Sequence, residues 1–162
     1  MKKLNKSIYF ALLLNLVVSF SAYSLDFNRG KNKLPFEAKV EVKESKIKVK
    51  SKTEVVLTFK IDKDSYIYKE SVSFKINNSN GLKVGKPIFP KAEKKLDKFS
   101  GTQKEIYHNS LSVRLPIEAL DSVKQGKSEL DVTIGYQGCS KAICFLPQEK
   151  NIKVPVEFIK KK

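Results

Sequence analysis

The chain carries its only two cysteines within the stretch GYQGCSKAICFLP, residues 135–147. Four residues separate Cys139 from Cys144. Glycine before the first cysteine and proline after the second indicate a tight, stiff connection between two strands. A hairpin tip of this kind can hold two sulfur atoms within bonding distance of each other.

Short segments on both sides of this hairpin alternate apolar and polar residues, and residues 55–61 form a more continuous run rich in β-branched side chains. The alternating apolar positions are Phe36, Ala38, Val40, Val42, Ile47, Val49, Val72, Phe74, Ile76, Leu111, Val113, Leu115, Leu130, Val132, Ile134, Ile152, Val154 and Val156. Turn-forming residues at 77–81 and 124–126 separate the segments. The pattern predicts an all-β fold, an immunoglobulin-like antiparallel β-sandwich, with a short helical turn expected only at residues 116–123.

The spacing of the cysteines is compatible with three kinds of chemistry. A structural disulfide closing a loop of about six residues would stabilise the fold by roughly 2 kcal/mol, which is little for a disulfide. A redox pair in a short loop would be reduced more easily than such a structural disulfide. A metal site could use the two cysteines and His108, the only histidine, which is one ligand short of a structural zinc site. The metal site that remains possible is copper bound by the two thiols.

The first 24 residues have the composition of a secretory signal. Three lysines within the first six residues precede an apolar run over residues 8–20, and small residues follow at Ala22 and Ser24. We expect a signal peptide at residues 1–24 and a single exported domain at residues 25–162, and we favour cleavage over an uncleaved membrane anchor. Disulfides persist in the compartment that such a signal leads to.

The chain is strongly basic, with a formal net charge of +15, of which +12 remains after removal of residues 1–24. An excess of positive charge of this size raises the question of whether the protein binds nucleic acid. Export argues against it, and so does the alternation of lysines with apolar residues at positions 46–50. The lysines therefore indicate a solvated sheet face and a general attraction to acidic partners or anionic surfaces, with no nucleic acid expected.

The cysteine stretch resembles the active-site hairpin of a known family. Residues 136–139, Tyr-Gln-Gly-Cys, followed by a short spacer, Cys144 and Pro147, are similar to the N-terminal periplasmic domain of the thiol:disulfide interchange protein DsbD. The spacer has four residues where the best-known members have five, and Leu146 replaces a first proline. The resemblance implies a sandwich fold and a redox-active Cys139–Cys144 disulfide, with no other cofactor and no metal.

Tyr66 and Tyr68 lie two residues apart in an extended segment, so their side chains face the same side of the strand. Cross-strand packing with solvated hydroxyls would by itself account for such a pair. In the family that the chain resembles, a Tyr-x-Tyr at this place lies beside the disulfide. The resemblance therefore implies that the two phenols pack on the sulfurs and supply a hydrogen bond to a thiolate.

A third motif begins at Asp97 and continues through Phe99, Gly101 and Glu-Ile-Tyr at residues 105–107. It resembles the family's cap loop, with Lys98 where better-known members have a second acid. A surface phenylalanine needs no functional explanation. As a cap, however, the Phe99 ring would cover the disulfide and move away when a partner docks. Asp97 near a sulfur would discourage thiolate formation and assist proton transfer.

The resemblance implies a periplasmic thiol–disulfide exchange relay, a component of a protein-disulfide reductase, with Cys139 and Cys144 as catalytic residues. Cys144 is expected to form the mixed disulfides and Cys139 to resolve them. The chain has no Cys-x-x-Cys and no second long apolar stretch, so a separate membrane-embedded thiol reductase is the expected electron donor. The expected acceptors are thioredoxin-fold periplasmic proteins of the disulfide isomerase or cytochrome c maturation type. The alternative is an immunoglobulin-like binding or adaptor module with a purely structural disulfide.

Overall fold

Strands account for most of the chain in the computed structural model, which describes residues 34–98 and 100–160. Their side chains alternate between buried and exposed; in β3, for example, every second residue from Thr53 to Ile61 is buried. The strands are β1 (Phe36–Val42), β2 (Lys46–Lys48), β3 (Lys52–Ile61), β4 (Ser65–Tyr68), β5 (Ser73–Ile76), β6 (Leu82–Val84), β7 (Glu93–Leu96), β8 (Gln103–Tyr107), β9 (Ser110–Ala119), β10 (Gly126–Tyr136), β11 (Gly138–Ser140) and β12 (Gln148–Ile159). A 3-10 turn, η1 (Lys69–Ser71), follows β4.

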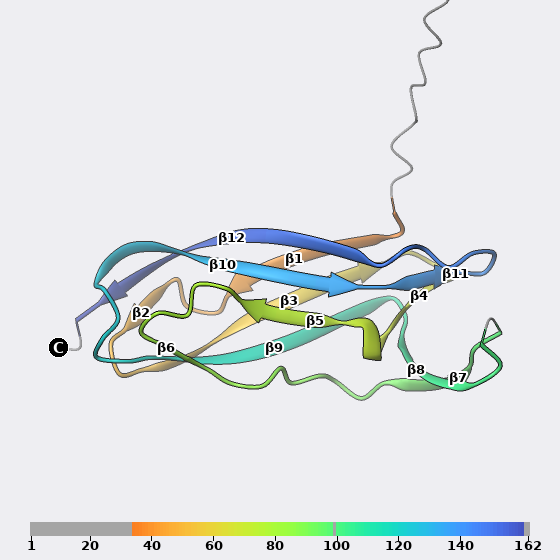
Figure 1. Ribbon diagram of the computed structural model, residues 1–162, viewed down its shortest axis with the longest axis horizontal. Helices are drawn as coiled ribbons and strands as arrows, with labels where there is room; N and C mark the ends of the chain where they lie inside the picture. Colours follow the sequence, from red (N-terminus) through yellow and green to blue (C-terminus); the bar gives the residue numbers. More distant parts are fainter. Residues whose placement is uncertain (1–33, 99, 161–162) are drawn as a thin grey trace, which may run out of the picture. The chain divides into compact units, whose positions relative to one another are not determined.

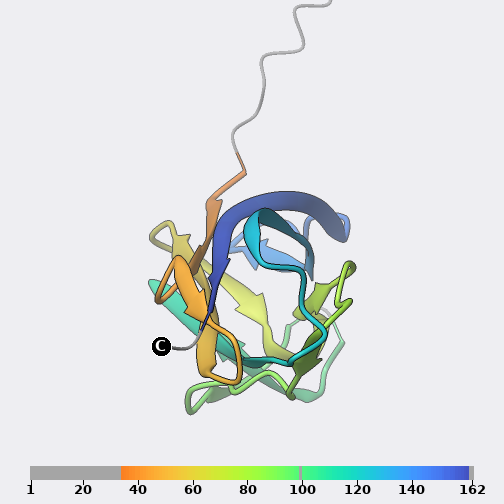
Figure 2. The same cartoon turned by 90° about the vertical axis from the view of Figure 1, so that its left-hand side faces the viewer.

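Two four-stranded sheets enclose the main core, with strand orders β1-β3-β9-β6 and β2-β12-β10-β5 (Figures 1 and 2). All pairs within them are antiparallel except β2 with β12. Inward-facing side chains such as Leu57 and Phe59 from one sheet and Val132 and Ile134 from the other are fully buried. The predicted all-β, immunoglobulin-like sandwich is confirmed.

The helical turn expected at residues 116–123 is wrong: residues 116–119 belong to strand β9, and residues 120–123 form a turn closed by a hydrogen bond from Val123 N to Leu120 O at 3.1 Å. Strand β9 continues to Ala119, with Pro116 opposite Glu54 of β3. Ile117 and Ala119 are buried, so the two-residue period of the strand continues through the proline. The Pro116 carbonyl accepts a hydrogen bond from Gly85 N at 2.8 Å, which supports an extended conformation at this position.

A third sheet, with strand order β11-β4-β8-β7, lies at one end of the sandwich (Figure 1). Its strands directly follow or precede sandwich strands in the chain: β4 follows β3, β8 precedes β9 and β11 follows β10. Asp64 (φ 66°) and Asn109 (φ 58°) make two of these connections in the left-handed region, which Asp and Asn tolerate better than other side chains. At the bends the chain passes from a strand of the sandwich to a strand of the third sheet. We call this third sheet the end sheet.

The predicted signal peptide at residues 1–24 and the predicted cap residue Phe99 lie outside the described residues. The compact unit that contains the sandwich begins at Leu34, within the expected domain of residues 25–162. In the described part of the chain, no helix has the length and apolar character needed to cross a membrane.

Candidate functional site

Cys139 and Cys144 form a disulfide at the tip of a hairpin that begins with β11. The two cysteines face each other across an antiparallel bridge, with their Cα atoms 3.9 Å apart. Backbone hydrogen bonds flank the pair on both sides, from Ser140 N to Ile143 O at 2.8 Å and from Phe145 N to Gly138 O at 3.0 Å. The cysteines thus occupy a non-hydrogen-bonded pair, where facing side chains of a ladder approach most closely.

Ser140 shapes the loop between the cysteines. Its Oγ accepts hydrogen bonds from Ala142 N at 3.3 Å and Ile143 N at 3.2 Å, as serine hydroxyls do in turns. Ser140 pairs with Ile143, which leaves only residues 141 and 142 in the loop itself. A four-residue spacer therefore places the two cysteines directly opposite each other.

Gly138 allows the hairpin to lie close to its neighbours. A Cβ atom at this position would be 2.4 Å from Phe36 Cζ and 2.5 Å from the carbonyl oxygen of Tyr66. Phe36 also packs edge-to-face on Phe145, with ring centroids 5.6 Å apart. The glycine before the first cysteine is thus explained by close packing as well as by the turn.

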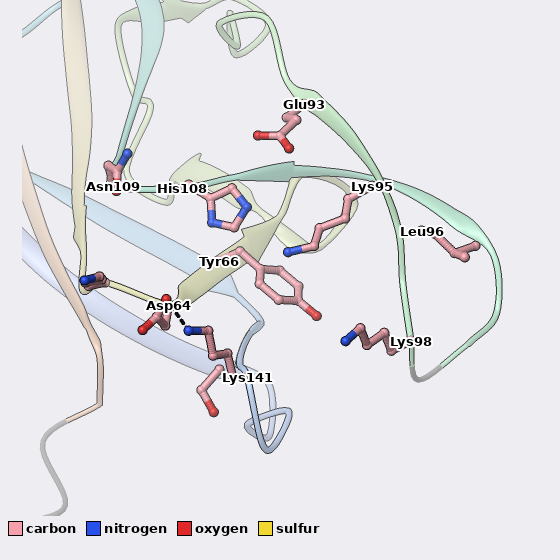
Figure 3. A pocket seen from close by; sticks show the side chains of 11 residues that line it. Asp64, Tyr66, Glu93, Lys95, Leu96, Lys98, His108, Asn109 and Lys141 are labelled. Atoms are coloured by element: carbon pink, nitrogen blue, oxygen red, sulfur yellow. Dashed lines mark ion pairs between the residues drawn. The ribbon is translucent and has the colours of Figure 1, made fainter.

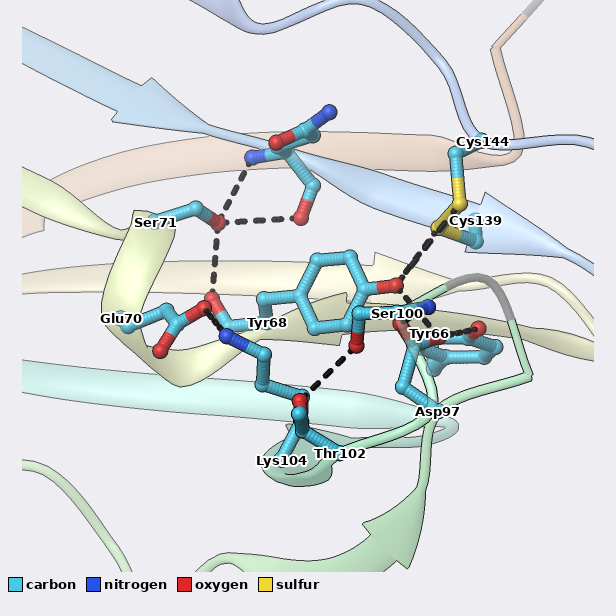
Figure 4. A network of polar contacts seen from close by, with 11 residues as sticks. Tyr66, Tyr68, Glu70, Ser71, Asp97, Ser100, Thr102, Lys104, Cys139 and Cys144 are labelled. Atoms are coloured by element: carbon cyan, nitrogen blue, oxygen red, sulfur yellow. Dashed lines mark hydrogen bonds and ion pairs between the residues drawn. A yellow bond between two sulfur atoms is a disulfide. The ribbon is translucent and has the colours of Figure 1, made fainter.

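Tyr68 lies beside both sulfur atoms (Figure 4). Strand β11 pairs with β4 so that Cys139 is opposite Tyr66, and the two tyrosine rings pack edge-to-face at 5.4 Å. The Tyr68 hydroxyl oxygen lies 3.2 Å from Cys139 Sγ and 3.7 Å from Cys144 Sγ. Both tyrosines belong to one small buried cluster with Ile106 and Cys139, which we call the sulfur cluster.

Asp97 holds the tyrosine hydroxyls in place from the loop between β7 and β8. The buried carboxylate accepts hydrogen bonds at Oδ1 from the hydroxyls of Tyr68 at 2.9 Å and Tyr66 at 3.4 Å. Its Oδ2 accepts one from Ser100 N at 2.9 Å, which orders the loop as well.

The two tyrosines remain protonated far above neutral pH. Burial, followed by hydrogen bonding to Tyr66 and Asp97, raises the pKa of Tyr68 well above the ordinary value of 10.0. Burial is also the main cause that raises the pKa of Tyr66. Tyr68 has a single proton, which it donates to Asp97 in the disulfide state, so its lone pairs face the sulfurs. A thiolate formed at either sulfur would compete with Asp97 for that proton.

The two cysteines differ in their access to solvent. Cys139 is fully buried, whereas Cys144 is half-buried. Two exposed apolar side chains, Ile143 (55% exposed) and Leu146 (80% exposed), flank Cys144 in the chain. Cys144 is therefore the more accessible of the two cysteines, and exposed apolar side chains are close to it in the chain.

Comparison with known proteins identifies the family. The family model described as thiol:disulfide interchange protein DsbD, N-terminal, matches residues 33–155. The chain belongs to this family. It is 34% identical over 96 residues to the thiol:disulfide interchange protein DsbD of Pasteurella multocida, and 30% identical over 100 residues to that of Klebsiella pneumoniae. These matches cover 59% and 61% of the chain but only 15% of each relative's length.

Solved structures of the DsbD N-terminal domain share the fold. The reduced domain from Neisseria meningitidis aligns with a TM-score of 0.58 and 23% identity over 76% of this chain and 86% of that chain. The structure of the complex between the DsbD and PilB N-terminal domains from the same organism aligns with a TM-score of 0.54 and 24% identity, covering 73% of this chain and 80% of that chain. At these identities the likeness establishes the fold alone.

Five of the six residues singled out in this DsbD-family sequence come together in the structure: Cys139, Cys144, Tyr66, Tyr68 and Asp97. The sixth, Phe99, is outside the described residues. The hydrogen bond of His108 does not involve the sulfurs: its Nδ1 donates to the carbonyl oxygen of Ser65 at 3.0 Å. Over residues 34–98 and 100–160, no group of three or more His, Cys, Asp or Glu side chains could hold a metal ion.

Two positioning residues were missed from the sequence, Ser71 and Gln137. Ser71 Oγ contacts the carbonyls of Tyr68 at 2.8 Å and Gln137 at 3.0 Å and accepts a hydrogen bond from Gln137 N at 2.9 Å (Figure 4). The Gln137 side chain in turn donates from Nε2 to Phe145 O at 3.1 Å across the hairpin. Gln137 belongs to the recognised Tyr-Gln-Gly-Cys motif, whereas no local pattern marks Ser71.

Proposed function

We propose that this domain exchanges thiols and disulfides with protein partners through Cys139 and Cys144. The observation that carries the proposal is the asymmetric environment of the disulfide. One cysteine is fully buried and the other half-buried, and a single hydroxyl, that of Tyr68, lies within 3.2 Å and 3.7 Å of the two sulfurs. An accessible sulfur can attack or be attacked, and a buried neighbour can resolve the product.

In the proposed reaction the dithiol form reduces a partner. The Cys144 thiolate attacks one sulfur of the partner's disulfide, a mixed disulfide forms, and the other partner sulfur leaves as a thiolate. The Cys139 thiolate then attacks the Cys144 sulfur, which restores the Cys139–Cys144 disulfide and releases the second partner sulfur. Two electrons and two protons pass to the partner.

Tyr68 and Asp97 take part in this proposal as proton-holding groups. The Tyr68 hydroxyl turns from Asp97 to the sulfur when a thiolate forms and stabilises it by a charge-assisted hydrogen bond. The Asp97 carboxylate, one hydroxyl away from the sulfurs, opposes thiolate formation while no partner is bound. The dithiol is thus held mostly protonated until a partner docks.

The same proposal covers partners and location. We place the domain in the periplasm, behind a signal peptide at residues 1–24, with a separate membrane-embedded thiol reductase as electron donor. The acceptors are thioredoxin-fold periplasmic proteins of the disulfide isomerase or cytochrome c maturation type. Membership of the DsbD N-terminal family supports this scheme, as does the complex that the Neisseria DsbD N-terminal domain forms with the PilB N-terminal domain.

The competing function is a binding or adaptor module whose disulfide only stabilises the hairpin. A disulfide that closes so short a loop adds only about 2 kcal/mol to the free energy of unfolding. Backbone hydrogen bonds on both sides of the cysteine pair already hold the hairpin without it. The arrangement thus favours a reactive disulfide over a structural one.

The midpoint potential of the Cys139–Cys144 pair tests the proposal. The domain is equilibrated in glutathione buffers of graded potential, and the dithiol and disulfide forms are separated after thiol trapping. We expect a midpoint between roughly −120 and −270 mV, the range of exchange catalysts. A midpoint below about −300 mV would make the disulfide structural and would refute the exchange function.

A further inference from the structure

A basic pocket opens beside the disulfide hairpin and strand β7 (Figure 3). It has a volume of about 660 Å³ and is open to solvent. Its lining includes four lysines, Lys63, Lys95, Lys98 and Lys141, against two carboxylates. The lysines come from the β3–β4 turn, β7, the loop after β7 and the cysteine hairpin, so the fold gathers them from three separate parts of the chain.

Three of these lysines form no ion pair with a described residue. Lys141 forms an ion pair with Asp64 at 2.8 Å, but Lys63, Lys95 and Lys98 have no ion-pair partner within 4.0 Å among the described residues. Lys95 instead holds its ammonium group 5.0 Å from the centre of the Tyr66 ring. With four lysines against the carboxylates of Asp64 and Glu93, the described lining has an excess of two positive charges.

Two lysines of η1 and β8, by contrast, are paired. Lys69 pairs with Glu105 at 2.7 Å, and Lys104 pairs with Glu70 at 2.6 Å. These two lysines of the end-sheet region are thus neutralised by carboxylates of the chain, whereas three lysines of the pocket form no ion pair among the described residues.

The pocket is continuous with the reactive site. Tyr66 forms part of its wall and is also a member of the sulfur cluster. Ser140 and Lys141, which follow Cys139 directly, form another part. A group bound in the pocket consequently contacts residues that adjoin the disulfide in the chain. A partner docked at Cys144 can therefore reach the pocket with side chains that flank its own reactive cysteine.

We propose that this pocket binds carboxylate groups of the redox partner, so that the domain selects proteins whose reactive disulfide is flanked by acidic residues. The inference rests on the proposed exchange function. Uncompensated ammonium groups at the mouth of a cleft attract anions and raise the rate of encounter, and they slow the approach of cationic partners.

Three small disulfides of different charge test this selectivity. The dithiol form is reacted with 3,3′-dithiodipropionate (a dianion), bis(2-hydroxyethyl) disulfide (neutral) and cystamine (a dication), at about 10 mM salt, where screening is weak. Each rate constant is divided by that of dithiothreitol with the same disulfide, which removes differences in intrinsic reactivity. We expect the dianion to react about 10-fold faster than the neutral disulfide, cystamine to be slowest, and the differences to collapse in about 1 M salt.

Two triple variants of equal net charge separate the pocket from the overall charge of the protein. In the first, Lys63, Lys95 and Lys98 are changed to glutamine; in the second, the changes are Lys48→Gln, Lys83→Gln and Lys127→Gln in β2, β6 and the start of β10, toward the other end of the sandwich (Figure 1). The pocket variant should lose most of the preference for the dianion, to less than about 3-fold, while the distant variant keeps it. Equal losses in both variants, or no preference in the unmodified domain, would overturn the inference.

The neutral disulfide reports on the exchange function by itself. If the unmodified domain fails to reduce it, the proposed function fails, and the pocket is then judged by binding of adipate, an unreactive dicarboxylate, to the disulfide form. Amide shifts at residues 95, 98, 140 and 141 that the pocket variant lacks would support carboxylate binding, and their absence would refute it. If the domain shows no preference for the dianion but binds phosphatidylglycerol vesicles through the same lysines, the pocket would belong to a membrane surface and the inference would be wrong.

Discussion

The sandwich core and the sulfur cluster are both buried, yet they are built from different side chains. The core between the two large sheets consists of aliphatic and aromatic residues that alternate along the strands. The sulfur cluster combines two tyrosines, an isoleucine and a cysteine, with a buried aspartate bonded to the tyrosine hydroxyls. Buried polar groups require hydrogen-bond partners. The sulfur cluster is therefore held by a hydrogen-bonded network, whereas the sandwich core is held by apolar packing.

Two tyrosines make the difference concrete. Tyr136 is 1% exposed and packs edge-to-face on Phe59 with centroids 4.8 Å apart, and its hydroxyl has no hydrogen-bond partner among the described residues. Tyr68 is 8% exposed, and its hydroxyl contacts Asp97 and both sulfurs. The same residue type fills space in one region and holds a proton beside a disulfide in the other.

Replacing the cysteines should have the largest effect, and only on the sulfur cluster. Cys144→Ser should abolish exchange and mixed-disulfide formation, because the remaining sulfur of Cys139 is buried. Cys139→Ser should also stop turnover but accumulate a stable mixed disulfide with a partner disulfide, detectable by mass spectrometry. Unfolding in urea should show that loss of the disulfide costs about 2 kcal/mol with the sandwich intact.

The reverse trapping pattern, with a stable mixed disulfide only in Cys144→Ser, would reassign the attacking sulfur to Cys139. It would also mean that the hairpin opens before it reacts.

Gly138→Ala should disturb the junction between the two regions. The added Cβ would lie 2.4 Å from Phe36 Cζ, so the hairpin must shift away from β1 and β4, at a cost of about 1–3 kcal/mol. Gly85→Ala is the matched control, because its added Cβ comes no closer than 3.2 Å to the nearest atom, Pro116 O. Urea unfolding compares the two. Equal destabilisation by both changes would refute the close-packing explanation for Gly138.

Tyr68→Phe and Tyr136→Phe should differ in their effect on the free energy of unfolding. The first change removes a donor from the buried Asp97 carboxylate and should lower the free energy of unfolding by about 1–2 kcal/mol. The second removes a hydroxyl that lacks a partner and should change it by less than about 0.5 kcal/mol or stabilise the fold.

Exchange kinetics provide the second readout for this pair. Tyr68→Phe should shift the pH profile of thiol alkylation to higher pH, because the thiolate loses its hydrogen-bond donor. Tyr136→Phe should leave the profile unchanged. Identical profiles in all three proteins would remove Tyr68 from the proposed chemistry.

The smallest expected effect is that of pH on the free energy of unfolding. We expect almost no change near neutrality and a growing loss of stability above pH 10. The folded-state pKa values of Tyr66, Tyr68 and Tyr107 are raised above 10.0, mainly by burial. Below pH 10 both folded and unfolded states are protonated, so the full stability is present; above it the unfolded tyrosines ionise first and stability falls. Urea midpoints between pH 8 and pH 11 measure the slope.

Tyr68→Phe serves as the control for this slope, because it removes one of the three groups. Its stability should decline less steeply with pH than that of the unmodified domain. A decline of the same steepness would assign the pH effect to other groups.

Local sequence patterns were sufficient to predict the sandwich and the facing cysteines. The two-residue period is a property of each strand alone, and it also carries β9 through Pro116, where a helical turn was expected. A four-residue spacer ending in a two-residue loop places Cys139 opposite Cys144 without help from the rest of the chain. The Tyr66–Tyr68 pair was predicted to share a face for the same local reason.

Only the tertiary structure decided which polar groups meet the sulfurs and which lysines remain uncompensated. Tyr68 and Cys139 are 71 residues apart in the chain, and Asp97 is 29 residues from Tyr68. Their contact depends on the bends at Asp64 and Asn109, which let strands leave the sandwich and pair again in the end sheet. Contacts over such separations follow from strand pairing across the whole fold, and no local period or spacing encodes them.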